Sequence, residues 1–423
     1  MTHHSGFSLI VLAVASVLMT ACSTTQPHMI PAPAIYQHPE VDFYRSLSDD
    51  LKTTDKPVFY FTNRKADKSG GQHYLDTQGK RLVMGRADVH LGEDDWSFDD
   101  LRRSDGGDTY NYPRPGKVKA TTEFGAFTDD STEAEAAFID AINAQIDKSA
   151  NKELAFYVHG YRVFFDEATV MMASWSHYLG GSALVTFQWP TGQHFWNYLT
   201  DCPRAEKYIP DITRSIVLLS KTKAKQINLL AYSCGSPLMA KALHNIKQSH
   251  PEMDHEALRA RFRISNVSFV ASDVDLKTFA HDQVPAILEL SEQTNVYFSR
   301  NDGALRWSGI LAGASRLGRP NVEDLSPEDI SRLAEHPRFT GIDVSNVEGA
   351  HEMGGMTGHG YWYANGEIAT DVLISLLHAA PPNQRCLSPS GAPNIWLFPD
   401  GYVDCVAKTL LDIAPRLKRQ SEE

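Results

Sequence analysis

The sequence of 423 residues lacks the motifs that would assign it to several large classes of proteins. It contains no Walker phosphate loop, no G-x-G-x-x-G dinucleotide motif and no H-E-x-x-H zinc motif, so it implies no metal or other cofactor. Positive charge is also scarce, because 40 lysines and arginines stand against 52 aspartates and glutamates, a formal net charge of -12. Nucleic acid is therefore not an expected partner.

Cysteine is scarce as well, and the first of the five marks a processing site. An apolar stretch from Phe7 to Ala21 ends directly before Cys22, in the order M-T-A-C, which resembles a bacterial lipobox although positive residues are missing before it. We expect a lipoprotein signal peptide over residues 1–21 and an acylated Cys22, followed by a tether over residues 22–50. Ser23 indicates an outer-membrane lipoprotein, anchored to the membrane by lipid and facing the periplasm.

The other four cysteines would lie in an oxidising compartment. Cys386 and Cys405 belong to a C-terminal extension, residues 381–423, that is rich in proline and glycine and shows no helical period. They are predicted to form a disulfide. Cys202 and Cys234 lie within the apolar core region and are predicted to be free and buried.

Strand and helix patterns alternate regularly from Leu154 onward, which is typical of a mostly parallel sheet with helices on both faces. Together with two earlier strands near Val58 and Gly85, the pattern predicts eight strands in one domain, residues 51–380. Residues 93–152 are predicted to be an insertion that carries one helix near residues 133–146. The six later strands are predicted at 154–158, 183–188, 227–232, 264–271, 295–299 and 339–347.

The stretch L-L-A-Y-S-C-G-S resembles the nucleophile elbow of serine hydrolases. An apolar strand ends at Tyr232, and a segment with helical spacing follows Ser233. The sharp turn between them requires small residues two positions before and after the serine, and these are Ala231 and Gly235. Ser233 is therefore predicted to be a nucleophile at the carboxyl edge of the sheet.

Further polar residues follow other predicted strands in the order that the α/β-hydrolase fold uses. His159-Gly160-Tyr161-Arg162 stands where this fold completes its oxyanion hole, so the backbone N–H groups of Tyr161 and Cys234 are the expected donors. Asp302 follows the seventh strand and His359 the eighth. The order serine, acid, histidine predicts a catalytic triad, in which the imidazole takes the serine proton and the carboxylate orients the imidazole.

Each of these assignments has an alternative. Asp273 follows the sixth strand and could replace Asp302 as the acid, or it could cap the next helix. His351 could replace His359 as the base. A zinc site at His351 is not expected, because no second histidine lies one helical turn later.

The chain resembles a bacterial α/β-hydrolase family long labelled only as a domain of unknown function. The matching stretches fall within residues 57–377 and read V-F-Y-F-T-N-R, Y-V-H-G-Y-R, F-Q-W-P-T-G, L-L-A-Y-S-C-G-S, S-D-V-D-L, Y-F-S-R-N-D-G-A-L and T-G-H-G-Y-W. The resemblance implies an α/β-hydrolase fold and serine-hydrolase chemistry. Two departures stand beside the site: Arg162-Val163 replaces two asparagines, and Tyr232-Ser233-Cys234 replaces His-Ser-Met.

The substrate is indicated only by apolar segments near the predicted site. Trp189, Phe195, Trp196 and Tyr198 follow the fourth strand, and residues 305–338 begin with a mostly apolar run. These segments could form an acyl-binding pocket and a lid, or ordinary core packing. We therefore expect a serine esterase of the cell envelope acting on small acyl esters, with two alternatives: an amidase or peptidase using the same triad, and an anchored binding or scaffold protein whose triad is idle.

Overall fold

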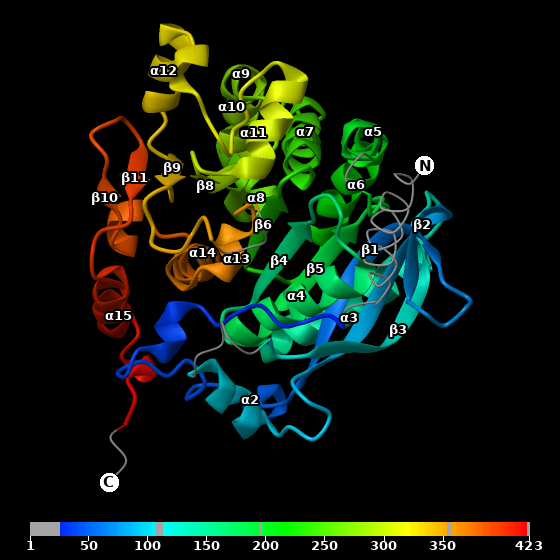
Figure 1. The fold of residues 1–423 in the computed structure, drawn as a ribbon. Helices are drawn as coiled ribbons and strands as arrows, with labels where there is room; N and C mark the ends of the chain where they lie inside the picture. Colours follow the sequence, from blue (N-terminus) through cyan, green and yellow to red (C-terminus); the bar gives the residue numbers. More distant parts are fainter. Residues whose placement is uncertain (1–25, 107–112, 195–196, 353–356, 421–423) are drawn as a thin grey trace, which may run out of the picture.

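A computed structural model describes residues 26–106, 113–194, 197–352 and 357–420 of the chain. A single sheet runs through the molecule and carries helices on both sides (Figure 1). Among the described residues it has eleven strands in the order β10-β11-β9-β8-β7-β6-β4-β5-β1-β2-β3. The predicted class, an α/β-hydrolase fold with a mostly parallel sheet, is confirmed.

The strands are parallel in the centre of the sheet and antiparallel at both edges. Adjacent strands pair in parallel along the series β1, β5, β4, β6, β7, β8, β9 and β11. The pairs β1–β2, β2–β3 and β10–β11 are antiparallel. The strands are β1 (Asp55–Ala66), β2 (Tyr74–Leu91), β3 (Gly116–Ala126), β4 (Glu153–Val158), β5 (Ala183–Gln188), β6 (Gln226–Tyr232), β7 (Ile264–Val270), β8 (Ser291–Phe298), β9 (Phe339–Asp343), β10 (Ser388–Pro389) and β11 (Ile395–Leu397).

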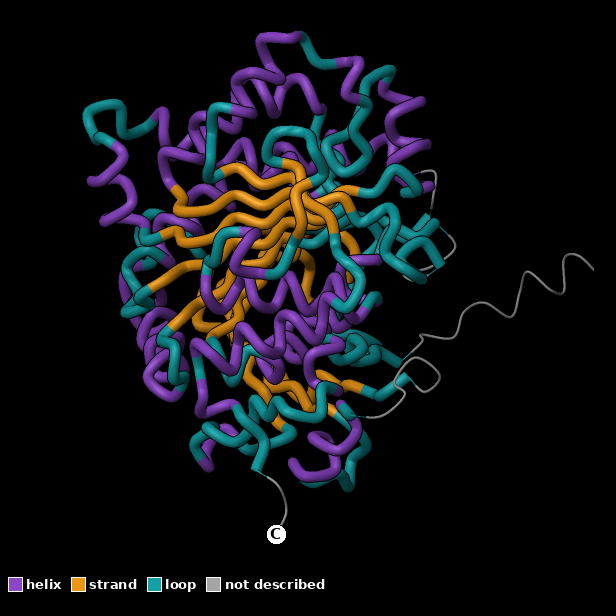
Figure 2. Tube along the Cα trace, turned by 90° about the vertical axis from the view of Figure 1, so that its left-hand side faces the viewer, coloured by secondary structure: helices purple, strands orange, loops and turns teal. Residues whose placement is uncertain are grey.

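Helices cover the two faces of the sheet (Figure 2). They bury a separate apolar core on each face. The core under α4 and α14 also receives α15, and the core on the other face packs α3, α6, α7 and α10. Strands β4 and β5 are buried at every residue, as expected for strands covered on both faces. The described helices are α2 (Phe98–Asp105), α3 (Thr132–Lys148), α4 (Phe165–Tyr178), α5 (Tyr198–Arg204), α6 (Ile209–Leu219), α7 (Gly235–Gln248), α8 (His255–Phe262), α9 (Leu276–Thr278), α10 (Val284–Leu290), α11 (Gly303–Ala312), α12 (Pro327–Ala334), α13 (Tyr361–Ala364), α14 (Gly366–His378) and α15 (Tyr402–Ile413).

The predicted number of eight strands was too low, because β3, β10 and β11 were missed. Strand β3 lies at the edge of the sheet and is exposed or half-buried at most positions, so its sequence carries no apolar run. Strands β10 and β11 have only two and three residues. Residues 93–152, predicted as an insertion, supply β3 and also α2 and α3. The helix predicted near 133–146 is α3.

The predicted tether is folded onto the domain wherever the structure describes it. Ile35 and Tyr36 are buried; the Ile35 N–H donates to Thr370 Oγ1 of α14 at 3.2 Å, and the Tyr36 hydroxyl donates to the Tyr178 carbonyl at 2.5 Å. From residue 29 on, this segment is therefore not a free spacer, because its apolar side chains pack into one of the two apolar cores. The predicted signal peptide and the predicted acylation site Cys22 lie outside the described residues. Within these, no helix has the length and apolar character needed to cross a membrane.

The C-terminal extension contains the predicted disulfide, since Cys386 and Cys405 are bonded. The expectation of no helix there was wrong. Helix α15 buries Tyr402, Val406 and Leu410, one residue every four positions, which is helical spacing that the surrounding prolines and glycines obscured.

Candidate active site

Ser233 stands in a strained turn between β6 and α7, as a nucleophile elbow requires. Its φ angle is 51°, in the left-handed region that residues with a side chain seldom occupy. The Ser233 N–H donates to the Val270 carbonyl at 3.2 Å, and its own carbonyl accepts from the Ser236 N–H at 2.9 Å. These bonds hold the strained conformation, and the side chain stands at the carboxyl edge of the sheet.

Two glycines allow the chain to pass this close to the serine. A Cβ atom on Gly235 would stand 2.5 Å from the Val158 carbonyl oxygen and 2.6 Å from that of His159, so no larger residue fits there. A Cβ atom on Gly160 would stand 2.9 Å from the Ser233 Cβ. The elbow thus lies directly against the loop that follows β4.

Ser233, His359 and Asp302 form one continuous line of hydrogen bonds. His359 Nε2 lies 2.8 Å from Ser233 Oγ, and His359 Nδ1 lies 2.7 Å from Asp302 Oδ2. The carboxylate fixes the imidazole tautomer with the proton on Nδ1, which leaves Nε2 free to accept the serine proton. The other oxygen of Asp302 accepts the Leu305 N–H at 3.0 Å, so the start of α11 holds the carboxylate in place.

The surroundings of His359 set its protonation. Burial lowers the pKa of the imidazole. The Asp302 carboxylate raises that pKa through its charge and its hydrogen bond, and the charge of Asp273 also raises it. The increase outweighs the effect of burial, so the pKa lies above its ordinary 6.5. The Asp302 side chain is completely buried. The pair therefore favours an imidazolium when the serine proton arrives.

The alternative residues lie outside this line. Asp273 accepts the hydroxyls of Tyr198 and Ser308, each at 2.5 Å, and its carboxylate stands 3.3 Å from Arg316 Nε. It does not cap the following helix, because the N-cap of α9 is Asp275. The side chain of His351 is half exposed, and the carboxylate it meets among the described residues is that of Glu352, at 3.8 Å.

The two residues predicted as oxyanion donors lie on different segments, Tyr161 on the loop after β4 and Cys234 at the elbow after β6. Among the described residues, neither the Tyr161 nor the Cys234 backbone N–H donates a hydrogen bond, so both are available to an anion at Ser233. Three bonds fix this loop. The Trp189 indole donates to the His159 carbonyl at 2.9 Å, the Arg162 N–H donates to Thr191 Oγ1 at 2.8 Å, and Arg64 donates to the Val163 carbonyl at 2.6 Å.

Arg64 is a supporting residue that sequence reasoning missed. It is buried, and its guanidinium also bonds Asp76 at 2.9 Å from the end of β1. Burial and the neighbouring Arg64 charge lower the pKa of His159 to about 3, so that imidazole stays neutral and serves the loop rather than proton transfer. A single arginine at the end of the apolar run V-F-Y-F-T-N was the signal that could have found it.

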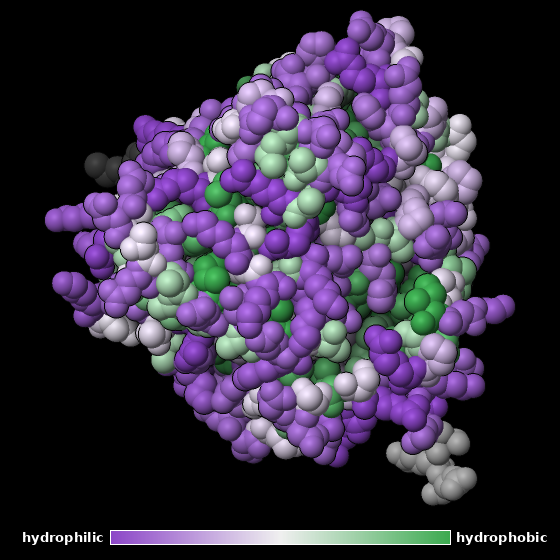
Figure 3. All heavy atoms as spheres, turned by 180° about the vertical axis from the view of Figure 1, so that it is seen from behind, coloured by the Kyte–Doolittle hydropathy of each residue, from purple (hydrophilic) through white to green (hydrophobic). Residues whose placement is uncertain are grey.

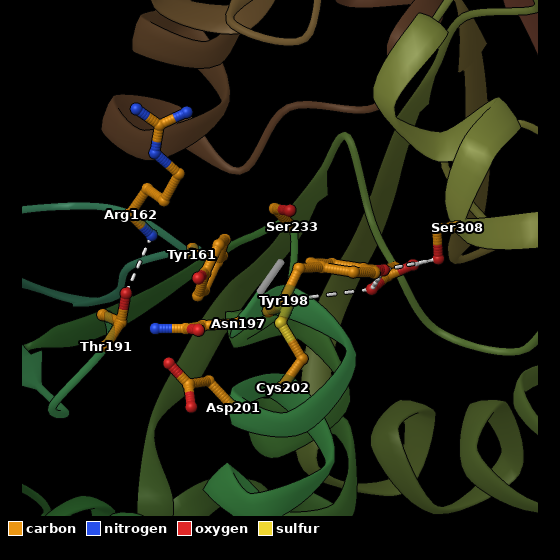
Figure 4. The surroundings of a disulfide bond; sticks show 12 residues. Tyr161, Arg162, Thr191, Asn197, Tyr198, Asp201, Cys202, Ser233 and Ser308 are labelled. Atoms are coloured by element: carbon orange, nitrogen blue, oxygen red, sulfur yellow. Dashed lines mark hydrogen bonds between the residues drawn. A yellow bond between two sulfur atoms is a disulfide. The ribbon is translucent and has the colours of Figure 1, made fainter. Parts of the chain in front are cut away.

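A disulfide joins Cys202 and Cys234 (Figure 4). The prediction that both cysteines are free was wrong, because α5 folds back over the elbow and brings together sulfurs 32 positions apart in the sequence. An even number of cysteines after Cys22 was the only signal for it. The two sulfurs and the Asp273 carboxylate lie within 4.8 Å of one another, but the disulfide occupies the sulfurs and leaves no thiolate for a metal.

A hollow of about 390 Å³ adjoins the elbow between α5 and α11. Its apolar lining includes Leu199, Pro237 and Leu311, and Tyr198 and Asp273 contribute polar groups. Of the aromatic residues predicted for an acyl pocket, Tyr198 lines this hollow, whereas Trp189 is buried beneath the loop and stacks on His159. Phe195 and Trp196 lie outside the described residues.

Comparison with known proteins identifies a family. The family model described as "Alpha/beta hydrolase of unknown function (DUF900)" matches residues 134–377, more than half of the chain. No curated protein matches the sequence. Similar solved structures include an esterase from Thermogutta terrifontis, with 10% identity, a TM-score of 0.30 and coverage of 56% of this chain and 84% of that one. The phospholipase PlaB from Legionella pneumophila is also similar, with 12% identity, a TM-score of 0.18 and coverage of 45% of this chain and 39% of that one.

Proposed function

Since the chain belongs to the alpha/beta hydrolase family of unknown function, DUF900, we propose that it is a serine hydrolase that cleaves carboxylic esters. The observation that carries the proposal is the unbroken line of hydrogen bonds from Asp302 through His359 to Ser233, with the serine in a strained turn. A serine that merely capped a helix would need neither the strain nor the buried acid behind the imidazole.

The proposed reaction has two steps. Ser233 Oγ attacks the acyl carbonyl carbon while His359 Nε2 takes the serine proton, and the N–H groups of Tyr161 and Cys234 stabilise the oxyanion. The intermediate then expels the alcohol, which receives the proton from His359. Water, deprotonated by the same imidazole, attacks the acyl-enzyme in the second step and releases the acid.

The hollow beside the elbow indicates the size of the acyl or alcohol group. Its volume of about 390 Å³ and its apolar lining by Leu199, Pro237 and Leu311 favour short or medium apolar groups over large polar ones. We further propose that acylation of Cys22 anchors the enzyme to the outer membrane, where it would act on esters of the envelope.

A fluorophosphonate probe tests the assignment, because it reacts only with an activated serine. Wild-type protein should label, and Ser233→Ala should not. Ser236→Ala is the matched control: this serine is buried three residues later and donates to the Ala231 carbonyl, so its loss should leave labelling intact. Acyl esters of increasing chain length, with one amide, then define the substrate. An unlabelled wild type would favour an idle scaffold, and faster cleavage of the amide would favour an amidase.

A further inference from the structure

The outer face of α11 carries three of the six large apolar residues that are exposed in the described chain. Trp307 is 59% exposed, Ile310 62% and Leu311 51%, and Leu199 of neighbouring α5 is 52% exposed. Seen from behind the view of Figure 1, the surface is mostly hydrophilic, with hydrophobic residues scattered in small groups (Figure 3). A tryptophan and two aliphatic residues within five positions of one exposed helix indicate a surface that meets a partner.

A basic hollow adjoins this face. It has a volume of about 550 Å³, and its lining includes Ile310 of α11 and four arginines, which are Arg300, Arg306, Arg316 and Arg319. One carboxylate, that of Asp324, also lines the hollow, and it accepts a hydrogen bond from the Ser315 hydroxyl. On a chain with a net charge of -12, this is a local excess of positive charge.

Two of the arginines already have acidic partners and two do not. Arg300 pairs with Asp343 at 2.7 Å and Arg316 with Asp273 at 3.3 Å. Within the described residues, no carboxylate lies within 4.0 Å of the guanidinium groups of Arg306 and Arg319. Two guanidinium groups beside an apolar helix face offer planar donors that suit phosphate oxygens.

The same helix is part of the candidate active site. Asp302 is its N-cap, and its inner side carries Leu305 and Ser308, both buried, with Ser308 bonded to Asp273. The outer side carries Arg306, Trp307 and Ile310. A surface that binds the outer side therefore comes within one helix diameter of the triad acid.

We propose that α11 and the four-arginine hollow form a docking surface for a bilayer containing anionic phospholipids. Lipid phosphates bind Arg306 and Arg319, and Trp307, Ile310 and Leu311 enter the boundary between headgroups and acyl chains. A bilayer fits better than a protein because it supplies phosphate and an apolar layer together, in the arrangement that the helix shows. Docking itself does not depend on catalysis. Delivery of lipid esters to Ser233 by the docked enzyme rests on the proposed function.

Quenching of tryptophan fluorescence by brominated lipids tests the docking in the full chain. The protein is reconstituted into vesicles of phosphatidylcholine, with or without phosphatidylglycerol, both with brominated acyl chains. Since the chain has seven tryptophans, the contribution of Trp307 is the difference between wild type and Trp307→Phe. We expect this contribution to be quenched in anionic vesicles, by at least about twofold more than in zwitterionic ones.

Two pairs of variants make the test specific. Arg306→Gln with Arg319→Gln should abolish the anionic preference, whereas Lys68→Gln with Lys80→Gln, two exposed lysines on the β1–β2 side, should keep it. Ile310→Glu should weaken quenching, and Ile413→Glu, at an equally exposed site of α15, should not. Quenching of Trp307 that is absent, or unchanged without the two arginines, would overturn the proposal. Failure of fluorophosphonate labelling would instead refute the proposed function and leave the docking result standing.

Discussion

Cys202 and Cys234 are bonded to each other, so the residue directly after Ser233 is tied to helix α5. The Cys234 N–H is one of the two proposed oxyanion donors, and α5 forms one wall of the adjoining hollow. The bond therefore connects the position of a donor to the position of the segment that covers the site. Tyr198 strengthens this connection, because its hydroxyl reaches Asp273 and Ser308 from the same helix (Figure 4).

Removing this disulfide should lower turnover more than it changes substrate affinity. In the double variant Cys202→Ser and Cys234→Ser we expect kcat to fall by about tenfold, because one oxyanion donor loses its fixed position. The matched control is Cys386→Ser with Cys405→Ser, which removes the remote disulfide. Loop-closure entropy predicts a loss of roughly 3 to 4 kcal/mol of stability in both cases. Equal loss of kcat in the two double variants would show that the Cys202–Cys234 bond matters only for stability.

Substitution of Asp302 and of Asp273 by asparagine should have clearly different effects on activity and stability. Asp302→Asn keeps the shape but presents an amide to His359 Nδ1, which favours the wrong tautomer, and should lower kcat on the order of 10⁴-fold, as in serine proteases. Asp273→Asn weakens bonds to Tyr198, Ser308 and Arg316 and should cost about 1 to 3 kcal/mol of stability with activity largely kept. Steady-state kinetics and thermal unfolding measure both. The reverse pattern would assign the acid to Asp273.

The pH profile of kcat/KM should report the raised pKa of His359. The imidazole must be neutral to accept the serine proton, so activity is full above the folded-state pKa and falls as the pH drops through it. Since Asp302 raises that pKa above 6.5, the inflection should lie above 6.5. In Asp302→Asn the carboxylate no longer offsets the lowering of the His359 pKa by burial, so the inflection should move to lower pH. A wild-type inflection well below 6.5 would contradict the geometry.

Lipid anchoring of the chain can be checked through Cys22. Substitution Cys22→Ser should block acylation, so the protein should accumulate unprocessed or leave the outer-membrane fraction. Fractionation followed by mass spectrometry of the N-terminus measures this. If membrane association and mass are both unchanged, ordinary secretion replaces the lipoprotein hypothesis.

The sequence by itself was sufficient for the central sheet and the elbow. Strands β4, β5 and β6 are mostly apolar runs bounded by polar turns, because a strand covered on both faces is largely apolar. Ser233 was visible because the elbow is local: the strand, the small residues and the helix are neighbours along the chain. The order of Ser233, Asp302 and His359 followed from the same alternation, since each stands after a recognisable strand.

Only the tertiary structure decided which distant residues meet. Asp302 and Asp273 both follow strands whose carboxyl ends share one edge of the sheet, and the fold alone brings Asp302 to His359 while Tyr198 and Ser308 occupy Asp273. The partner of Cys234 depended on how α5 folds back over the elbow. Likewise, the packing of the N-terminal segment and the edge strands depends on contacts between parts of the chain far apart in sequence, and periodicity carries no information about such contacts.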